Sequence, residues 1–330
     1  MAKISGDATL SDLARVAISK YLNQGISYEK EVLADADPED LHQMRVGLRR
    51  LRTALQVFEP AVNLPKAGRE PRVAAVARQL GELRDLDVIS ETLRKHYGPD
   101  LPDTEQQSLA RVLSQLFKQR QQVFKRVKKL LKGKKYGQMK QSLQEWTQHP
   151  SLTTFGQMPA ALIIPDLVGP LVSRLWLHPG FLVGATVSQG GFTADPDLKI
   201  DAVDRLMADQ GALLHSLRKQ VKRVRYQLKL VSHLYEGALD DDLARFSDIQ
   251  ETLGHLQDSM VLEEFVAKAI PDGKTQMPTL FALLADSRHR AWQQWQVQQN
   301  YYLEGAHRQA LRLAILHIAA LEPKSAPKST

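Results

Sequence analysis

The sequence LHQMRVGLRRLRTALQVF, residues Leu41 to Phe58, occurs twice in this chain. It returns as LHSLRKQVKRVRYQLKLV, Leu214 to Val231, at an ungapped offset of 173 residues (214 minus 41). The polar pairs that keep this register are His42/His215, Arg45/Arg218, Arg49/Lys222, Arg50/Arg223 and Arg52/Arg225. Chance does not readily preserve one register in this way, so we infer an internal duplication.

Each copy fits an α-helix that carries one apolar and one cationic stripe. At about 100° per residue, the leucines of the first copy share an arc with Met44 and Phe58. The neighbouring arc holds His42, Arg45, Arg49 and Arg52, whereas Arg50 lies apart on the polar side. Neither copy contains an acidic residue, although solvated helices usually gain support from Glu–Lys pairs. Like charges side by side are tolerable when an anion covers them, so we predict an anionic partner.

A second pair of segments keeps the same register: LGELRDLDVI (80–89) and LGHLQDSMVL (253–262). Gly81 and Gly254 are expected to permit close helix packing, because Gly within a helix otherwise costs about 1 kcal/mol. Asp85 and Asp258 are expected to orient arginine side chains rather than to act as catalytic carboxylates. We predict an all-α fold of two antiparallel helical bundles related by an internal pseudo-two-fold repeat.

Capping residues, prolines and glycines divide the chain into four parts. We expect a first bundle over 1–150, a Pro/Gly-rich connection with one helix over 151–197, a second bundle over 198–322 and a disordered tail over 323–330. No strand is expected. The expected helices span about 9–33, 38–59, 73–97, 104–132, 136–147, 162–177, 198–235 (with a possible break at Gly211), 239–268 and 277–321.

The composition is that of a soluble globular protein, with 43% hydrophobic and 25% charged residues. The net charge of +7 is concentrated in residues 1–160, which hold 26 basic and 18 acidic residues. Cysteine is absent, which excludes disulfides and thiolate metal sites. The N-terminus lacks the apolar core of a signal peptide, and prolines and charges interrupt Ala160–Gly184, so we expect a cytoplasmic protein that does not enter membranes.

The helix expected over 104–132 is the other strongly basic element. Its cations recur every seven residues and so stay on nearly one face. These residues are Arg111, Lys118, Lys125 and Lys132, flanked by Lys128 and Lys129. Arg120 points toward the apolar side, which makes it a candidate cation facing a cavity. A solvated basic surface explains this stripe about as well as a binding site does.

The duplicated pattern H-x-x-R-x-x-x-[RK]-R-x-R, followed by LG-x-x-x-D-x-x-V, resembles the CHAD family, the conserved histidine α-helical domain. The resemblance covers nearly the whole chain and includes the connection IPDLVGPLVSRLWLHPGFLVG (164–184). It implies two helical bundles around a basic cavity that binds inorganic polyphosphate, without a fused triphosphatase domain. One departure is that Arg84 in the first LG segment becomes Gln257 in the second.

Polyphosphate would be bound as a nucleic-acid backbone is, by many Lys and Arg contacts with strong salt dependence. The candidate ligands are His42, Arg45, Arg49, Arg50, Arg52, Arg120, Lys125, Lys129, Lys132, His215, Arg218, Lys222, Arg223 and Arg225. The two histidines could donate to phosphate, serve as structural residues or, least favoured, ligate a metal.

The expected function is a polyphosphate-binding module that targets or organises polyphosphate granules, with polyphosphate-metabolism enzymes as potential partners. We find no nucleophile–base pair, no P-loop and no H-E-x-x-H, so we expect neither an enzyme nor a cofactor. Two alternatives stay open. A nucleic-acid or other polyanion binder would share the charge, although the basic helices lack interleaved aromatics for base stacking. A polyphosphate-processing enzyme would show Mg²⁺-dependent release of phosphate.

Overall fold

The N-terminal helices form where the capping residues predict them. In the computed structural model, which describes residues 8–188, 191–194 and 198–318, Thr9 and Asp12 form a capping box at the start of α1. Asp37 accepts a hydrogen bond of 2.8 Å from the Glu39 amide and so caps the cationic helix. The helix expected over 9–33 is interrupted after Ile26. These elements are α1 (Leu10–Ile26), α2 (Glu29–Ala34) and α3 (Pro38–Val57).

The rest of the first half also follows the predicted order. The third helix ends in a π-helical segment, Thr92–Tyr97, before Gly98 and Pro99. Short 3₁₀ turns connect several elements. The helices of this half are α4 (Glu70–Glu91), α5 (Asp103–Leu131) and α6 (Lys134–Gln148). The 3₁₀ turns of the whole chain are Glu59–Ala61, Lys66–Gly68, Gly98–Asp100, Phe155–Gln157, Pro179–Leu182 and Ser232–Leu234.

The connection contains one feature that the sequence reading did not predict. After α7 (Ala160–Trp176) the chain forms an antiparallel hairpin, β1 (Ala185–Ser188) with β2 (Gly191–Ala194). The expectation of no strand is therefore wrong. The strands were not predicted because four residues per strand are too few for a clear alternating pattern in the sequence. Ala160–Leu182 is long and apolar enough to span a membrane, but 44% of its most apolar window is buried in the protein, and core helices meet the same criterion.

In the second half the first two helices lie close to their expected bounds, and the last expected helix is divided. Gly211 causes no break, because α8 runs without interruption through it. The helix expected over 277–321 is divided at Glu304, whose backbone is extended. The helices are α8 (Ile200–Val231), α9 (Asp240–Ala269), α10 (Gly273–Gln276), α11 (Pro278–Leu303) and α12 (Gly305–Leu316). The tail expected over 323–330 lies outside the described residues.

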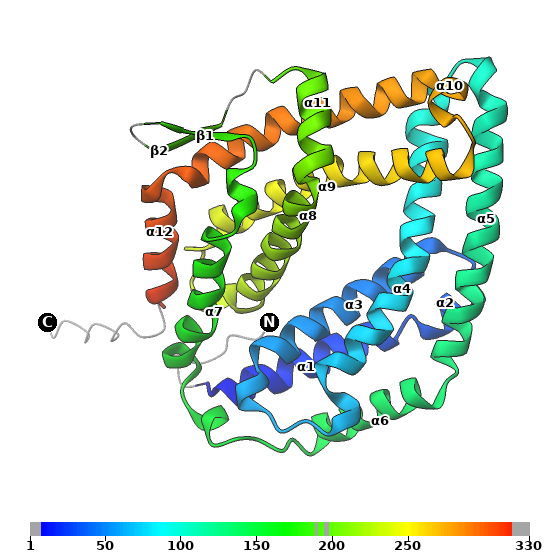
Figure 1. Ribbon diagram of the computed structural model, residues 1–330. Coiled ribbons are helices and arrows are strands. Elements are labelled where there is room, and N and C mark those ends of the chain that lie inside the picture. The colour runs from blue at the N-terminus through cyan, green and yellow to red at the C-terminus, as the bar shows by residue number, and fades with distance from the viewer. Residues whose placement is uncertain (1–7, 189–190, 195–197, 319–330) are drawn as a thin grey trace, which may run out of the picture.

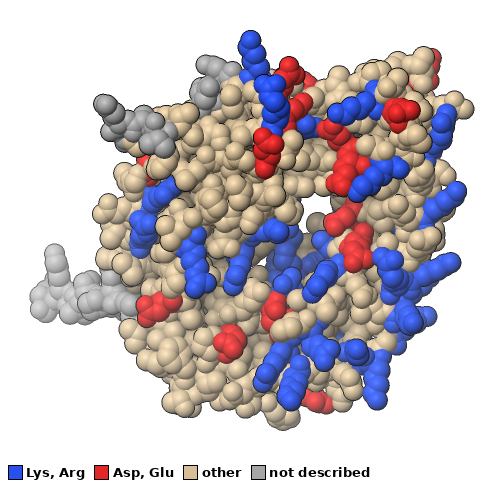
Figure 2. Space-filling view, viewed as in Figure 1, with Lys and Arg blue, Asp and Glu red and all other residues tan. Residues whose placement is uncertain are grey.

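The helices surround a central opening (Figures 1 and 2). In the view of Figure 1, α1 and α3 lie along the lower side, α4 and α5 along the right, and α9 and α11 along the top. The left side is formed by α7 and α12, with α8 inside it. Figure 2 shows that side chains leave this opening unfilled and that basic side chains border part of it. The all-α fold class is confirmed; the two-fold relation between the halves stays a prediction.

The two halves meet at two places. One apolar core runs through both halves, from α1 and α3 to α7, α8 and α12. A second core joins the far end of α4 and α5 to α9 and α11. There the buried carboxylate of Glu105 accepts hydrogen bonds from the amides of Thr279 (2.7 Å) and Leu280 (3.1 Å) and so caps α11. These two junctions close the chain around the opening.

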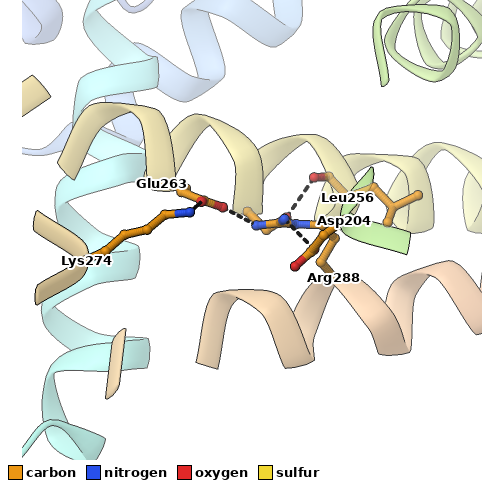
Figure 3. A network of polar contacts seen from close by, with 6 residues as sticks. Asp204, Leu256, Glu263, Lys274 and Arg288 are labelled. Atoms are coloured by element: carbon orange, nitrogen blue, oxygen red, sulfur yellow. Dashed lines mark hydrogen bonds and ion pairs between the residues drawn. The ribbon is translucent and has the colours of Figure 1, made fainter. Parts of the chain in front are cut away.

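In each half an arginine with little exposed surface ties the last long helix, α5 or α11, to preceding parts of the chain. In the first half, Arg120 of α5 forms ion pairs of 2.6 Å with Asp35 and Asp87. In the second half, Arg288 of α11 pairs with Asp204 of α8 at 2.6 Å and with Glu263 of α9 (Figure 3). The two arginines are not separated by the 173-residue offset of the repeat, so the register of the repeat does not relate them.

Candidate functional site: a central cationic cluster

Arg45 and Arg218 occupy equivalent surroundings. A Cβ placed on Gly81 would lie 2.6 Å from Nη1 of Arg45, and one on Gly254 would lie 3.1 Å from Nη2 of Arg218. Arg45 donates to the carbonyl of Ala77 at 3.4 Å. Arg218 likewise donates to the carbonyl of residue 250, which is 173 positions after 77, at 3.3 Å. The two glycines thus make room for guanidinium groups. This role is more specific than the close helix packing that the sequence predicts.

The cationic stripes of α3 and α8 converge where these helices contact each other. Burial and, after it, the positive charges of Arg49, Arg218 and Arg45 together lower the pKa of Lys222 to about 8. Burial also lowers the pKa values of Arg45 and Arg49. We call Arg45, Arg49, Arg218 and Lys222 the central cluster. It brings together two cations from each copy of the repeat, which the sequence predicted only separately.

Arg49 is held by an aromatic ring from the other copy. Its guanidinium carbon lies 4.4 Å from the ring centroid of Tyr226, a cation–π arrangement. The Nε of Arg49 is buried without a hydrogen-bond partner. Tyr226 is half-buried and its ring lies against Arg49 of the cluster. Its spacing of four residues from Lys222 is the sequence signal for this position.

Two carboxylates, one from each LG segment, face the cluster. Burial raises the pKa of Asp85, while Arg45, Lys222 and Arg218 lower it. Burial likewise raises the pKa of Asp258, and Arg218 is the strongest of the charges that oppose this. Both residues keep more than a third of their surface accessible, so they line a space that water can enter although protein surrounds it. Four cations against two carboxylates leave an excess of positive charge at the centre.

The motif histidines flank the cluster. Burial and nearby cations lower the pKa of His42, with Arg84, Arg49 and Arg45 contributing in that order, whereas Glu39 opposes them. Burial, Lys219 and Arg218 lower the pKa of His215. The Nδ1 of His215 is buried without a hydrogen-bond partner. Within the described residues, no group of three or more His, Asp or Glu is placed to hold a metal ion.

Three other arginines of the motifs have protein partners. Arg50 donates to Gln24 of α1 at 3.1 Å, and Arg225 donates to Gln250 at 3.1 Å. Arg52 forms an ion pair of 2.8 Å with Glu70. Arg223 is exposed on α8. Arg50 and Arg225 lie near Arg49, whose pKa is lowered mainly by burial and also by their charges, and none of the four belongs to the central cluster.

The candidates on α5 are placed differently from what the sequence suggests. Arg120 lines a cavity of about 430 Å³, but Asp35 and Asp87 occupy its donors and raise its pKa. We therefore leave Arg120 out of the central cluster, because its guanidinium already has two carboxylate partners. Lys125, Lys129 and Lys132 are exposed on the far side of α4 from α3. Arg84, which was not among the candidates, lies beside His42, and its place in the duplicated LG segment is the signal for it.

We expect the stability of the ligand-free protein to rise between pH 8 and pH 10.5 because of Lys222. Its pKa is about 8 in the folded state and 10.5 in the unfolded chain, so within this window the unfolded chain binds more protons. Raising the pH therefore favours folding, and below pH 8 the contribution is constant. Denaturant unfolding at pH 7.5 and 9.5 measures this difference. In the Lys222→Met variant the increase in stability between these two pH values that is due to Lys222 should vanish. An equal increase in the variant and the unmodified protein would contradict this prediction.

The structure thus defines a predominantly helical protein, with one short hairpin, in which cations of two repeated helices form a central cluster. A sequence model of the CHAD domain matches residues 16–267, and the chain belongs to the CHAD domain family. Two solved structures share its fold. The crystal structure of the CHAD domain from the plant Ricinus communis has a TM-score of 0.55 at 22% identity, covering 96% of this chain and 95% of that one. PptA from Streptomyces chartreusis has a TM-score of 0.63 at 16% identity, covering 89% and 100%. No curated protein matches the sequence.

Proposed function

We propose that this protein binds inorganic polyphosphate through the central cluster. The observation that carries the proposal is that four cations from the two repeats come together. Only the two carboxylates of Asp85 and Asp258 face them, which is not enough to neutralise their charge. Ligand-free, these cations repel one another, and this repulsion adds to the effect of burial, the larger cause, in lowering the pKa of Lys222. A chain of phosphates would relieve that repulsion and supply acceptors for Arg and Lys donors. Membership of the CHAD domain family supports the same ligand class.

The flanking residues extend the proposed site. His42 and His215 lie next to the cluster with pKa values lowered by burial, so a bound phosphate would favour their protonated forms. Each would then donate a charge-assisted hydrogen bond to the chain. The exposed Arg223 and the bordering Arg50, Arg52 and Arg225 would attract the anion at longer range. On this proposal the protein is a cytoplasmic binding module on polyphosphate granules and not an enzyme.

Titration with long-chain polyphosphate across a series of salt concentrations tests the proposal. If all four central cations contact phosphate, log K should fall with log salt at a slope of roughly −3 to −4. Single-stranded and double-stranded DNA serve as competitors. Displacement of polyphosphate by either DNA at equal phosphate concentration would favour the nucleic-acid alternative. Phosphate release that requires Mg²⁺ would favour the enzyme alternative.

Replacing Gly81 by Ala should weaken polyphosphate binding without weakening the fold. The added methyl would stand 2.6 Å from Nη1 of Arg45 and must displace that guanidinium from the cluster. Ala within a helix is favoured over Gly by up to about 1 kcal/mol, so stability should hold or rise. We expect a several-fold loss of affinity in the salt titration. Gly137→Ala on α6 is the matched control, because its Cβ would meet nothing within 4 Å; equal affinities of the two variants would contradict the role of Gly81.

A further inference from the structure

The outer face of α5 carries a second basic surface. Between Glu105 and Glu145 the sequence has three Arg, eight Lys and no acidic residue. Five of these cations fall on one helix face and are all exposed, and the structure gives none of the five an ion pair within its described residues. We call them the α5 ridge: Arg111, Lys118, Lys125, Lys129 and Lys132.

The ridge runs along one long helix that is firmly held. At 1.5 Å per residue, the 21 steps from Arg111 to Lys132 span about 32 Å. The opposite face of α5 is buried in both apolar cores, for instance through Val112 and Val127. Rigid attachment matters because a preorganised row of charges loses little entropy when an extended anion binds.

Other cations of the same segment form ion pairs with acidic residues. Arg120 pairs with Asp35 and Asp87, Arg126 pairs with Glu82 at 2.9 Å, and Lys140 pairs with Glu29. The ion pairs of the described residues include none of the five ridge cations. The contrast distinguishes the ridge from an ordinary solvated surface on which Lys and Glu alternate.

The ridge is separate from the central cluster. α4 packs against α3 on one side and against α5 on the other. Figure 2 shows basic side chains down the edge that α5 forms, others beside the opening, and acidic side chains between the two groups in this view. α4 therefore lies between the ridge on α5 and the helix α3 of the central cluster.

The composition of the ridge indicates what it binds. Four of its five residues are lysines, which act as point charges for phosphate oxygens. Phe117 is the exposed large apolar residue of α5, and Phe124 is buried beneath Lys128, whose Nζ lies 4.4 Å from the ring centroid. A surface that binds single-stranded nucleic acid needs several aromatic side chains for base stacking. A helix that lies on a membrane needs an apolar face toward the lipid. A linear phosphate chain without bases needs neither.

We propose that the α5 ridge is a second polyphosphate-binding surface, so that one molecule engages two polyphosphate chains, or two distant segments of one chain, and links them. The inference rests on the proposed function of the central cluster. Two separated sites on one rigid molecule give bivalent binding, whose strength exceeds that of either site alone. With long chains the protein would therefore form cross-linked assemblies, whereas short chains would occupy the sites singly.

The test compares assembly with binding in matched variants. The ridge variant carries Lys125→Gln, Lys129→Gln and Lys132→Gln; the control carries Lys66→Gln, Lys199→Gln and Lys268→Gln, exposed lysines of other elements. Light scattering with long-chain polyphosphate measures assembly, and titration with short-chain polyphosphate at a salt concentration that suppresses weak sites measures the central cluster. We expect the ridge variant to lose most of the scattering while its short-chain affinity changes less than about twofold, with a salt slope for long chains lower by up to about 0.9 per lost contact. The control should match the unmodified protein.

Other outcomes overturn the inference in distinguishable ways. Scattering by the ridge variant equal to that of the control removes the second surface but leaves the central site. Absence of polyphosphate binding by the unmodified protein removes the proposed function and this inference together. If the ridge variant assembles normally but loses binding to single-stranded RNA or to vesicles containing phosphatidylserine, the ridge serves that other polyanion instead.

Discussion

Reversing the charges of Arg45 and Arg218 together, as Arg45→Glu with Arg218→Glu, is expected to weaken polyphosphate binding by about 100-fold or more. Each arginine would lose a charge-assisted contact worth about 1.5–3 kcal/mol, and about 1.4 kcal/mol corresponds to a tenfold change in affinity. The new carboxylates would also stand beside Asp85 and Asp258, which already face these positions. The cluster would then hold more negative than positive groups.

The effect on folding should be much smaller. Both side chains are half-buried, and each makes one long hydrogen bond, of 3.4 or 3.3 Å, to a neighbouring helix. The salt titration measures affinity, and denaturant unfolding measures stability in parallel. Arg15→Glu with Arg312→Glu, two exposed arginines outside the repeated segments, controls for the change in net charge. Affinity equal to that control would refute the assignment of the central cluster.

The duplicated sequence made the centre of the molecule predictable. Periodicity placed the cations of α3 and α8 on one face, and the common register paired Arg45 with Arg218 and Gly81 with Gly254. The structure shows the same contacts at both pairs. It also brings the two stripes together, which no pattern within either helix contains, because their meeting depends on how α3 packs against α8.

Residues whose partners come from distant helices could not be assigned from the sequence. The sequence shows Arg120 as a cation on the apolar side of α5, but not that Asp35 and Asp87 converge on it. Lys125 shares the charge of the central cations, but α4 lies between it and them. The boundaries of α2, the β1–β2 hairpin and the break before α12 depend on one or two residues each. Secondary-structure propensity says least about single residues at the ends of elements, and tertiary contacts determine where such elements end.

Replacing Arg288 by Met should cost about 3 kcal/mol of the free energy of unfolding. Arg288 is 5% exposed, and its guanidinium holds Asp204 of α8, Glu263 of α9 and the hydroxyl of Ser259 at 3.2 Å (Figure 3). Met fills a similar volume but leaves two carboxylates without their buried partner, and breaking a buried ion pair in this way typically costs 3–5 kcal/mol. The partial exposure of both carboxylates places the expected value at the lower end.

Two companion variants separate the buried network from surface charge. Lys274 also pairs with Glu263, at 3.3 Å, but its side chain is 75% exposed, so Lys274→Met should change stability by less than about 1 kcal/mol. Arg288→Lys keeps the charge but cannot reach Asp204, Glu263 and Ser259 at once, so its loss should fall between the other two. Denaturant midpoints at constant slope measure all three. If Arg288→Met and Lys274→Met lose the same amount, the network contributes no more than a surface pair. The packing of α8, α9 and α11 would then rest on the apolar cores alone.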